Sequence, residues 1–340
     1  MEAWFVRQWQ INSVWQCVLR PVSWCFGMLV WLRRTAYRVG WLHSFSVGVP
    51  VIVVGNITVG GSGKTPLVLA LAALLTEHGK HVGIVSRGYV PHSQARQPDV
   101  MQILPGDVLS SDEATLLARR SGLPVYIGAD RVAVARALLH DHPTVNVIIS
   151  DDGLQHYALR RDVEICVIDG VRGLSNGAQL PAGPLRERAS RLDTVDAIVV
   201  NGVATSSSRA GAFAMSLANE SFVNLKTAQH VSPDAAREIM RGKRIHALAG
   251  IGHPARFFEH LGKLGFDLQT SRAFPDHHDF LGHEVALSNA DIILMTEKDA
   301  VKWSRFADER MWFMRVEALL PADFVDCIMH KLPPESPPCH

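Results

Sequence analysis

The residue pair best suited to chemistry in the first third of the chain is Lys64 and Thr65, which close the glycine-rich stretch GNITVGGSGKT. The backbone N–H groups of Gly60, Gly61 and Gly63 can surround an anion because no side chain stands in the way. A lysine at this place reaches terminal phosphates, and a threonine hydroxyl can bind Mg²⁺. The spacing therefore predicts a loop that binds the phosphates of a nucleotide.

The segments on either side of this turn are those that a phosphate-binding loop requires. Residues 51–54 are β-branched and apolar, which predicts a buried parallel strand, and residues 67–79 are typical of a helix. A merely flexible turn would not explain a Lys-Thr pair between a strand and a helix. The strict consensus has glycine where this chain has Thr58, so the loop is a variant. The predicted phosphate-binding residues of the loop are Thr58, Gly60, Gly61, Ser62, Gly63, Lys64 and Thr65.

Two pairs of acidic residues lie downstream. Asp151 and Asp152 follow the apolar segment 145–150, as in a Walker B element, whose carboxylate lies near the phosphate loop and binds Mg²⁺ directly or through water. Asp112 and Glu113 follow two serines at the predicted start of a helix, where acids also complement the helix dipole. The pattern alone leaves a structural and a catalytic role open for the second pair.

Composition narrows the class of protein. At 340 residues the chain has room for two domains with substantial cores. A net charge of +1 gives no general argument for binding nucleic acid, which needs a concentrated basic surface. Five scattered cysteines without CxxC spacing suggest neither a disulfide framework nor a zinc site, and they fit a reducing cytosolic setting.

Residues 1–38 form an aromatic and basic segment unlike the rest of the chain. Five tryptophans lie among aliphatic side chains, and the segment ends in Arg33, Arg34 and Arg38. Tryptophan and nearby cations favour a membrane surface, whereas the uncharged run 21–32 is too short to span a bilayer. We expect a helix that lies on or dips into the membrane. The alternative is a helix packed on the core of the protein itself.

The alternation of strand and helix patterns predicts an α/β fold, with a parallel sheet of the P-loop NTPase type flanked by helices and a second, smaller α/β domain. Within the connecting segment, two β-like stretches at 212–218 and 221–228 are candidates for a hairpin. The predicted units are the N-terminal membrane-interface segment 1–38, a P-loop nucleotide-binding domain 39–212, the connecting segment 213–242, the second domain 243–320, and a C-terminal helix with a frayed tail 321–340.

Some classes of P-loop protein do not fit. A GTPase would carry an Asn-Lys-x-Asp guanine reader, but the segment 296–299 has its lysine one place too late. Membrane-switch ATPases with a deviant loop have a lysine just before the glycine pair, where this chain has Val59. What remains is phosphoryl transfer or hydrolysis with ATP on a protein that touches a membrane.

Seven motifs, in this order and after the aromatic-basic segment, make the chain resemble the tetraacyldisaccharide 4′-kinase family of lipid A biosynthesis. They are GNITVGGSGKTP, VSRGY, SDEATLLA, DDGLQH, PAGPLRE, FPDHHDF and MTEKDAVKW, and the resemblance reaches about Trp303. It implies transfer of the γ-phosphate of ATP to the 4′-hydroxyl of a tetraacylated glucosamine disaccharide 1-phosphate, giving lipid IVA. It also implies a place at the cytoplasmic face of the bacterial inner membrane, as a peripheral or monotopic protein, with no obligate protein partner.

The resemblance also implies roles at the site. Asp112 would take the proton from the sugar hydroxyl, supported by His277 from the second domain. The chain departs from the family pattern at Ala114, which replaces a proline, and at His278, a second histidine that leaves two imidazoles as candidates. Arg186 would reach the phosphates, and the predicted metal group is Thr65, Asp151, Asp152 and Glu187.

One alternative from another class stays open. A membrane-associated P-loop ATPase or nucleotide-dependent regulator without a lipid acceptor would keep the phosphate loop, Asp151 and Asp152. It would have no need of a base such as Asp112 paired with a histidine from a second domain. Dependence of ATP turnover on added disaccharide lipid distinguishes the two.

Overall fold

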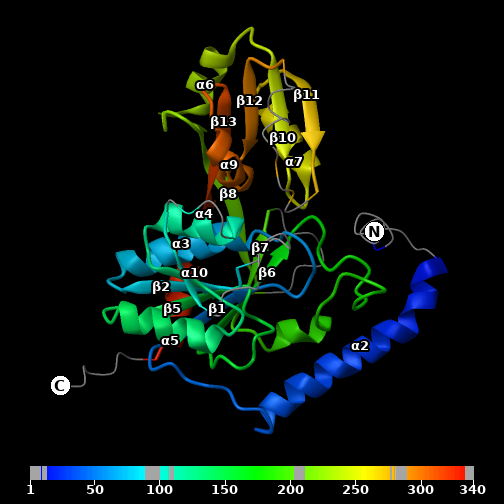
Figure 1. Ribbon diagram of the computed structural model, residues 1–340. Helices are drawn as coiled ribbons and strands as arrows, with labels where there is room; N and C mark the ends of the chain where they lie inside the picture. Colours follow the sequence, from blue (N-terminus) through cyan, green and yellow to red (C-terminus); the bar gives the residue numbers. More distant parts are fainter. Residues whose placement is uncertain are drawn as a thin grey trace.

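The structure is a computed structural model that describes residues 9, 14–88, 100–105, 107, 111–202, 211–275, 278, 280 and 289–333. Its described strands form one sheet in the order β11-β10-β12-β13-β8-β7-β6-β1-β5-β2-β4-β3, with β9 beside β8. The lower part of Figure 1 holds the strands from β7 to β3, which we call the first half, and the upper part holds β10 to β13, the second half.

The first half is a parallel sheet apart from β3, which runs antiparallel to β4. Apart from the edge strand β3, its strands are short, mainly apolar runs buried on both faces, as expected for a parallel sheet covered by helices. Because β1 pairs with β5 in register Val54 to Asp151, the loop after β1 and the acids after β5 meet at one sheet edge. The strands are β1 (Val51–Gly55), β2 (Val82–Ser86), β3 (Met101–Ile103), β4 (Val125–Ile127), β5 (Val147–Asp151), β6 (Val163–Asp169) and β7 (Ala197–Asn201).

Helices cover both faces of this half (Figure 1). The helices α3 (Lys64–Glu77), α4 (Asp112–Ser121) and α10 (Ala322–Lys331) contribute to the core on one face, and α5 (Arg131–Asp141) contributes to the core on the other. The C-terminal helix α10 therefore returns to the first half, where its Phe324 packs edge-on against Phe213. The predicted sheet of the P-loop type is confirmed.

The second half is smaller and has helices on both faces of its part of the sheet. Helices α6 and α7 share a core with its sheet on one face, and α9 packs on the other, where Trp303 is fully buried against Phe280. Its elements are α6 (Pro233–Met240), β10 (Ile245–Ala249), α7 (Pro254–Lys263), β11 (Leu268–Ala273), β12 (Ile292–Thr296), α9 (Glu297–Trp303) and β13 (Met311–Leu319). Two short 3-10 helices, η1 (Ala189–Asp193) and η2 (Ser304–Phe306), lie in connections.

A single strand, β8 (Phe213–Asn224), joins the two halves. Its start pairs in parallel with β7, and the rest pairs antiparallel with β13, while β9 (His230–Val231) pairs with its end. The hairpin prediction was therefore wrong. Asn219 has φ 52° opposite a register shift in β13, so the polar stretch that resembled a turn is a bulge within a continuous strand. The division of the chain into domains stays a prediction.

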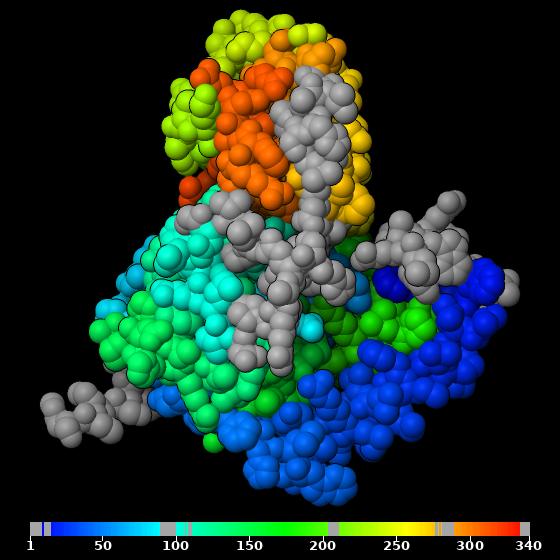
Figure 2. All heavy atoms as spheres, viewed as in Figure 1, coloured from blue at the N-terminus to red at the C-terminus, as the bar shows by residue number. Residues whose placement is uncertain are grey.

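Helix α2 (Val14–Arg38) lies along the outside of the first half (Figures 1 and 2). Its inner side contacts the loop before Arg186, because Ser23 Oγ donates to the Gln179 carbonyl at 2.7 Å. The described part of the chain holds no helix with the length and hydropathy needed to cross a membrane. The helix exposes a set of large apolar side chains: Trp15, Val18, Val22, Trp24, Met28, Leu29, Trp31 and Leu32.

Candidate active site

The glycine-rich loop connects β1 to α3, as the sequence predicts. Gly60 and Gly63 have φ 98° and 92°, values that only glycine adopts readily. A Cβ atom on Gly63 would also lie 2.3 Å from Asn201 Nδ2, which donates to the Ser62 carbonyl at 3.2 Å. The close approach of Asn201 therefore fixes the loop directly before the N-terminus of α3.

Neighbouring loops brace the glycine-rich turn on two sides. Val59 N donates to the Pro184 carbonyl at 2.9 Å, and Arg186 N donates to the Ile57 carbonyl at 2.7 Å. On the other side, the Arg172 guanidinium donates to the Gly61 carbonyl. The segment that contains Arg186 is thus held against the phosphate loop by backbone hydrogen bonds.

Lys64, Asp152 and Arg186 form one charged cluster. Asp152 Oδ1 lies 3.5 Å from Lys64 Nζ, and Asp152 Oδ2 lies 3.2 Å from an Arg186 guanidinium nitrogen. Burial raises the pKa of Asp152, but the positive charges of Lys64 and Arg186 outweigh burial and hold it below its ordinary value. Three residues predicted for the site are therefore in contact, and two cations converge at the start of α3.

Asp151 has a different environment from its neighbour. Its side chain is buried, Ser86 Oγ donates to Oδ2 at 3.3 Å, and Oδ1 has no hydrogen-bond partner among the described residues. Burial raises the pKa of Asp151 to about 7, and the negative charge of Glu113 adds to this effect while Lys64 opposes it. A buried, unpartnered carboxylate oxygen beside a phosphate loop suits a cation, which supports a metal at this position.

Glu187 belongs to a different set of contacts. Its carboxylate is buried and accepts hydrogen bonds from Gln155 Nε2 at 2.8 Å and from the Tyr157 hydroxyl at 2.6 Å. Arg191 Nε lies 3.5 Å from the same carboxylate. Among the described residues no group of three or more acids, histidines or cysteines is placed to hold a metal ion. The structure thus does not gather Glu187 with Asp151 and Asp152.

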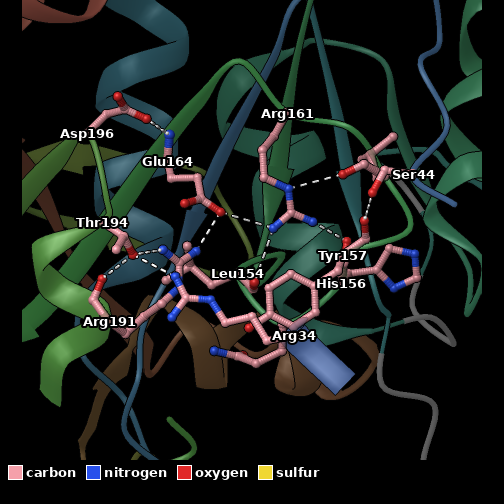
Figure 3. A network of polar contacts seen from close by, with 12 residues as sticks. Arg34, Ser44, Leu154, His156, Tyr157, Arg161, Glu164, Arg191, Thr194 and Asp196 are labelled. Atoms are coloured by element: carbon pink, nitrogen blue, oxygen red, sulfur yellow. Dashed lines mark hydrogen bonds and ion pairs between the residues drawn. The ribbon is translucent and has the colours of Figure 1, made fainter. Parts of the chain in front are cut away.

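The contacts around Glu187 extend into the polar network of Figure 3. Arg191 donates to Glu164 Oε1 at 2.5 Å and to Thr194 Oγ1 at 2.7 Å, and Arg34 donates to the same hydroxyl at 2.7 Å. Arg34 is on α2, so this network attaches the N-terminal helix to the first half. We interpret the contacts of Glu187 as structural.

Asp112 and Glu113 begin α4 and face the second half. Asp112 Oδ2 lies 3.2 Å from Lys302 Nζ, and Glu113 Oε1 lies 2.9 Å from Lys298 Nζ. Both lysines are on α9. Ser111 occupies the N-cap position, but its side chain makes no capping hydrogen bond. The helix start is therefore held by ion pairs to α9 instead of by a serine cap.

The predicted catalytic residue His277 lies outside the described residues. Its neighbour His278 is described, and its ring stacks on Phe274 with a centroid distance of 4.9 Å and packs edge-on against Phe280. The placement of His278 in an aromatic cluster makes it a core contact of the second half. The role of His277 stays a prediction.

Sequence reasoning missed several residues that contact the site. Asn201 and Ser86 end β7 and β2, and the rule that identified Asp151 could have found them, because carboxyl ends of parallel strands share one edge. Arg172 and Lys302 reach the site from distant segments, and no sequence spacing indicates such contacts.

His156, in the motif DDGLQH, is expected to make the stability of the protein depend on pH. Burial and the nearby charges of Arg131 and Arg161 lower its pKa to about 4, below the roughly 6.5 of an unfolded chain. Between these values the unfolded chain binds more protons than the folded protein, so His156 makes stability fall as pH drops from about 6.5 to about 4. We expect His156→Gln to lessen the loss of unfolding free energy between pH 7 and 5 by about 1–2 kcal/mol.

Urea unfolding of both proteins at pH 7 and 5 measures this difference. The matched control is His330→Gln, since His330 lies exposed on α10. An identical pH dependence for His156→Gln and the unmodified protein would contradict the assignment.

A parallel sheet with a glycine-rich loop between β1 and α3, and with acids at the end of the adjacent strand β5, defines a P-loop nucleotide-binding protein. The model of one family, described as tetraacyldisaccharide-1-P 4′-kinase, matches residues 15–333. The chain belongs to this family, which confirms the resemblance seen in its motifs.

Individual relatives agree with the family match. A protein named tetraacyldisaccharide 4′-kinase from Methylobacillus flagellatus is 46% identical over 97% of this chain and 96% of its own length. Another of the same name from Nitrosococcus oceani is 44% identical over 94% of this chain and 91% of its own. The crystal structure of LpxK from Aquifex aeolicus in complex with ATP has a TM-score of 0.75 and 27% identity, over 94% of this chain and all of that one.

Proposed function

We propose that this protein transfers the γ-phosphate of ATP to the 4′-hydroxyl of a tetraacylated glucosamine disaccharide 1-phosphate and forms lipid IVA in lipid A biosynthesis. Family membership supports the reaction, and the ATP complex of the structural relative supports the phosphate donor. One observation in this structure carries the proposal most directly. Lys64 and Arg186 converge on Asp152 beside the glycine-rich loop, at 3.5 and 3.2 Å, and Asp112 at the start of α4 lies 3.2 Å from Lys302 of the second half.

The loop amides from Gly60 to Thr65 and the cations Lys64 and Arg186 bind the phosphates of ATP. Phosphoryl transfer passes through a loose transition state, so positioning and charge neutralisation supply most of its acceleration. The 4′-oxygen forms a bond to the γ-phosphorus while the bond from that phosphorus to the β,γ-bridging oxygen breaks. ADP leaves, and Asp112 takes the hydroxyl proton, with His277 as its supporting partner.

We propose Mg²⁺ as the metal, with Asp151 and Thr65 as the residues that would hold it. The donor set fits, because Mg²⁺ is usually bound by one or two carboxylates together with substrate phosphates and water. The unpartnered Oδ1 of Asp151 is the atom available for it. When bound, the ion would neutralise charge on the phosphate oxygens. Asp152, predicted for the same group, pairs with Lys64 and Arg186 here.

We propose the cytoplasmic face of the inner membrane as the place of action, with α2 as the contact surface. A four-chain lipid stays in the bilayer, and the exposed apolar side of α2 can enter the interface beside its arginines. The hydrogen bond from Arg34 to Thr194 joins α2 to the first half, so a helix resting on lipid would carry the site to the headgroups. The acyl chains are the part of the substrate that this surface meets.

This membrane surface leads to a prediction. We expect the triple variant Trp24→Ser, Leu29→Ser and Trp31→Ser to bind vesicles at least about tenfold more weakly, because it removes apolar area that enters the interface. Co-sedimentation with vesicles that contain anionic lipid measures this loss.

A matched control removes three exposed apolar side chains away from α2, with Met101→Ser, Leu104→Ser and Leu319→Ser. ATP binding of both variants shows whether the nucleotide site is intact. Equal partitioning of the α2 variant and the unmodified protein would rule out α2 as the contact surface.

ADP release with and without the tetraacylated disaccharide 1-phosphate tests the function against the ATPase alternative. A lipid kinase releases ADP mainly when the acceptor is present. Release at the same rate without acceptor would favour a membrane-associated ATPase or regulator.

A further inference from the structure

The residues of the motif MTEKDAVKW connect the two halves of the protein. Helix α9, which contains most of this motif, lies next to α4 where the first and second halves meet (Figure 1), and the described residues of the two helices form three ion pairs. The pairs are Glu297 with Arg120 at 2.7 Å, Lys298 with Glu113 at 2.9 Å, and Lys302 with Asp112 at 3.2 Å.

Lys302 is the most deeply buried cation of these three pairs. Its side chain is 6% exposed, and its ammonium lies 5.7 Å from the centre of the Phe280 ring. Nζ makes no hydrogen bond among the described residues, and its burial is offset by the Asp112 carboxylate at ion-pair distance, with Asp299 adding to this electrostatically. A buried ammonium is costly without such a partner, which ties the position of Lys302 to that of Asp112.

The start of α9 is held rigidly, so Lys302 has a defined position. Thr296 Oγ1 donates to Asp299 Oδ2 at 2.6 Å, and Gly250 N donates to the same oxygen at 3.0 Å. The loop after Gly250 approaches the phosphate loop, because a Cβ on Gly252 would lie 3.3 Å from Gly61 N. Helix α9 is thus linked to the phosphate loop through the segment 250–252, and to Asp112 through Lys302.

We propose that Lys302 is a positioning residue for phosphoryl transfer, whose ammonium keeps the Asp112 carboxylate ionised and aimed at the acceptor hydroxyl. The proposal rests on the proposed role of Asp112 as the base. Because Lys302 belongs to the second half, Asp112 is fully competent only when α9 is seated on α4. The substrate hydroxyl then meets a carboxylate that is already deprotonated and ordered.

The ionisation of the Asp112 carboxyl depends on the charges around it. Glu113 is next to Asp112 on the same helix, and a like charge at that place disfavours ionisation of the Asp112 carboxyl. Lys298 is in contact with Glu113 and offsets that charge, and Asp299 lies within the electrostatic reach of both lysines. Lys302 forms its ion pair with Asp112 itself. A cation this close typically lowers a carboxyl pKa by about 1–3 units.

The test compares Lys302→Met, which keeps length and loses charge, with Lys302→Arg, which keeps the charge. In a plot of kcat for lipid phosphorylation against pH, we expect the acid limb to shift to higher pH by about one unit or more in Lys302→Met. The sign follows because a base without its cation holds its proton to higher pH. Lys302→Arg should retain a limb near that of the unmodified protein, and KM for ATP should change little in either variant.

Lys298→Met is the matched control, since it removes a neighbouring α9 lysine that pairs with Glu113. It should leave the acid limb within about half a unit of the unmodified protein, because it lacks the direct pair to the base. A merely structural role for Lys302 would lower activity at every pH and leave the limb in place. That result would overturn the proposal.

Lys302→Gln replaces Lys302→Met if the latter fails to fold, as judged by urea unfolding and ATP binding. It is expected to shift the limb in the same direction, and an unshifted limb would again overturn the proposal. Asp112→Ala distinguishes the positioning role of Lys302 from the role of Asp112 as the base. Full transfer by Asp112→Ala would refute the base itself, whereas an inactive Asp112→Ala beside an unshifted Lys302 variant would refute only the positioning role.

Discussion

Replacing Asp112 with alanine is expected to lower kcat for phosphate transfer by about 10²–10⁴-fold, the usual contribution of a general base. The reason is that Asp112 is the acid of α4 that pairs with Lys302, whereas Glu113 pairs with Lys298. ATP binding should change little, since the phosphates are held by the glycine-rich loop. Rates at saturating ATP and lipid, together with the dissociation constant for ATP, measure both effects.

Asp323→Ala is the matched control for this variant, because Asp323 also lies in the first turn of a helix, α10, and is exposed. If Asp112 only complements a helix dipole, both substitutions should cost a few tenths of a kcal/mol in stability and little activity. Equal kcat values for the two variants would contradict the role of Asp112 as the base.

Replacing Lys64 with methionine is expected to reduce kcat by at least about 10²-fold, because a positioned cation stabilises the charge that develops on the transferred phosphoryl group. The ion pair of Lys64 with Asp152 holds its ammonium in the charged cluster with Arg186 and away from solvent. Loss of Lys64 would also leave Asp152 with its ion pair to Arg186. Steady-state rates of lipid phosphorylation measure the loss.

Lys331→Met serves as the control, since Lys331 also pairs with an aspartate, Asp196, at the surface of the first half. Surface pairs of this kind contribute little, so we expect near-normal kinetics. Normal kcat in Lys64→Met would contradict the assignment of the glycine-rich loop as the phosphate site.

The parts of this structure that local patterns predict are those controlled by neighbours in sequence. The β-branched run before the loop and the apolar run before Asp151 predicted two strands whose ends lie near each other, and the structure pairs them as neighbours in the sheet. Asn219 shows the limit of such patterns. The polar residues around it resemble a turn, but pairing with β7 and β13 keeps β8 continuous.

The sequence indicated which charged residues belong to the site, but it did not indicate which residues they would contact. Glu187 follows Arg186 directly, yet the two side chains point to different partners, Arg186 to Asp152 and Glu187 to Gln155 and Tyr157. The ion pair of Asp112 with Lys302 joins positions that are distant in sequence. Contacts of this kind depend on how the two halves meet, and no spacing in the sequence records that.

The central claim is that a disaccharide lipid accepts the γ-phosphate of ATP at this site. Labelled γ-phosphate can be followed from ATP to a tetraacyldisaccharide 1-phosphate in detergent micelles, with the unmodified protein and Asp112→Ala side by side. We predict labelled lipid with the unmodified protein and a loss of about 10²–10⁴-fold with the variant. ATP hydrolysis by both proteins without any labelled lipid would contradict the account.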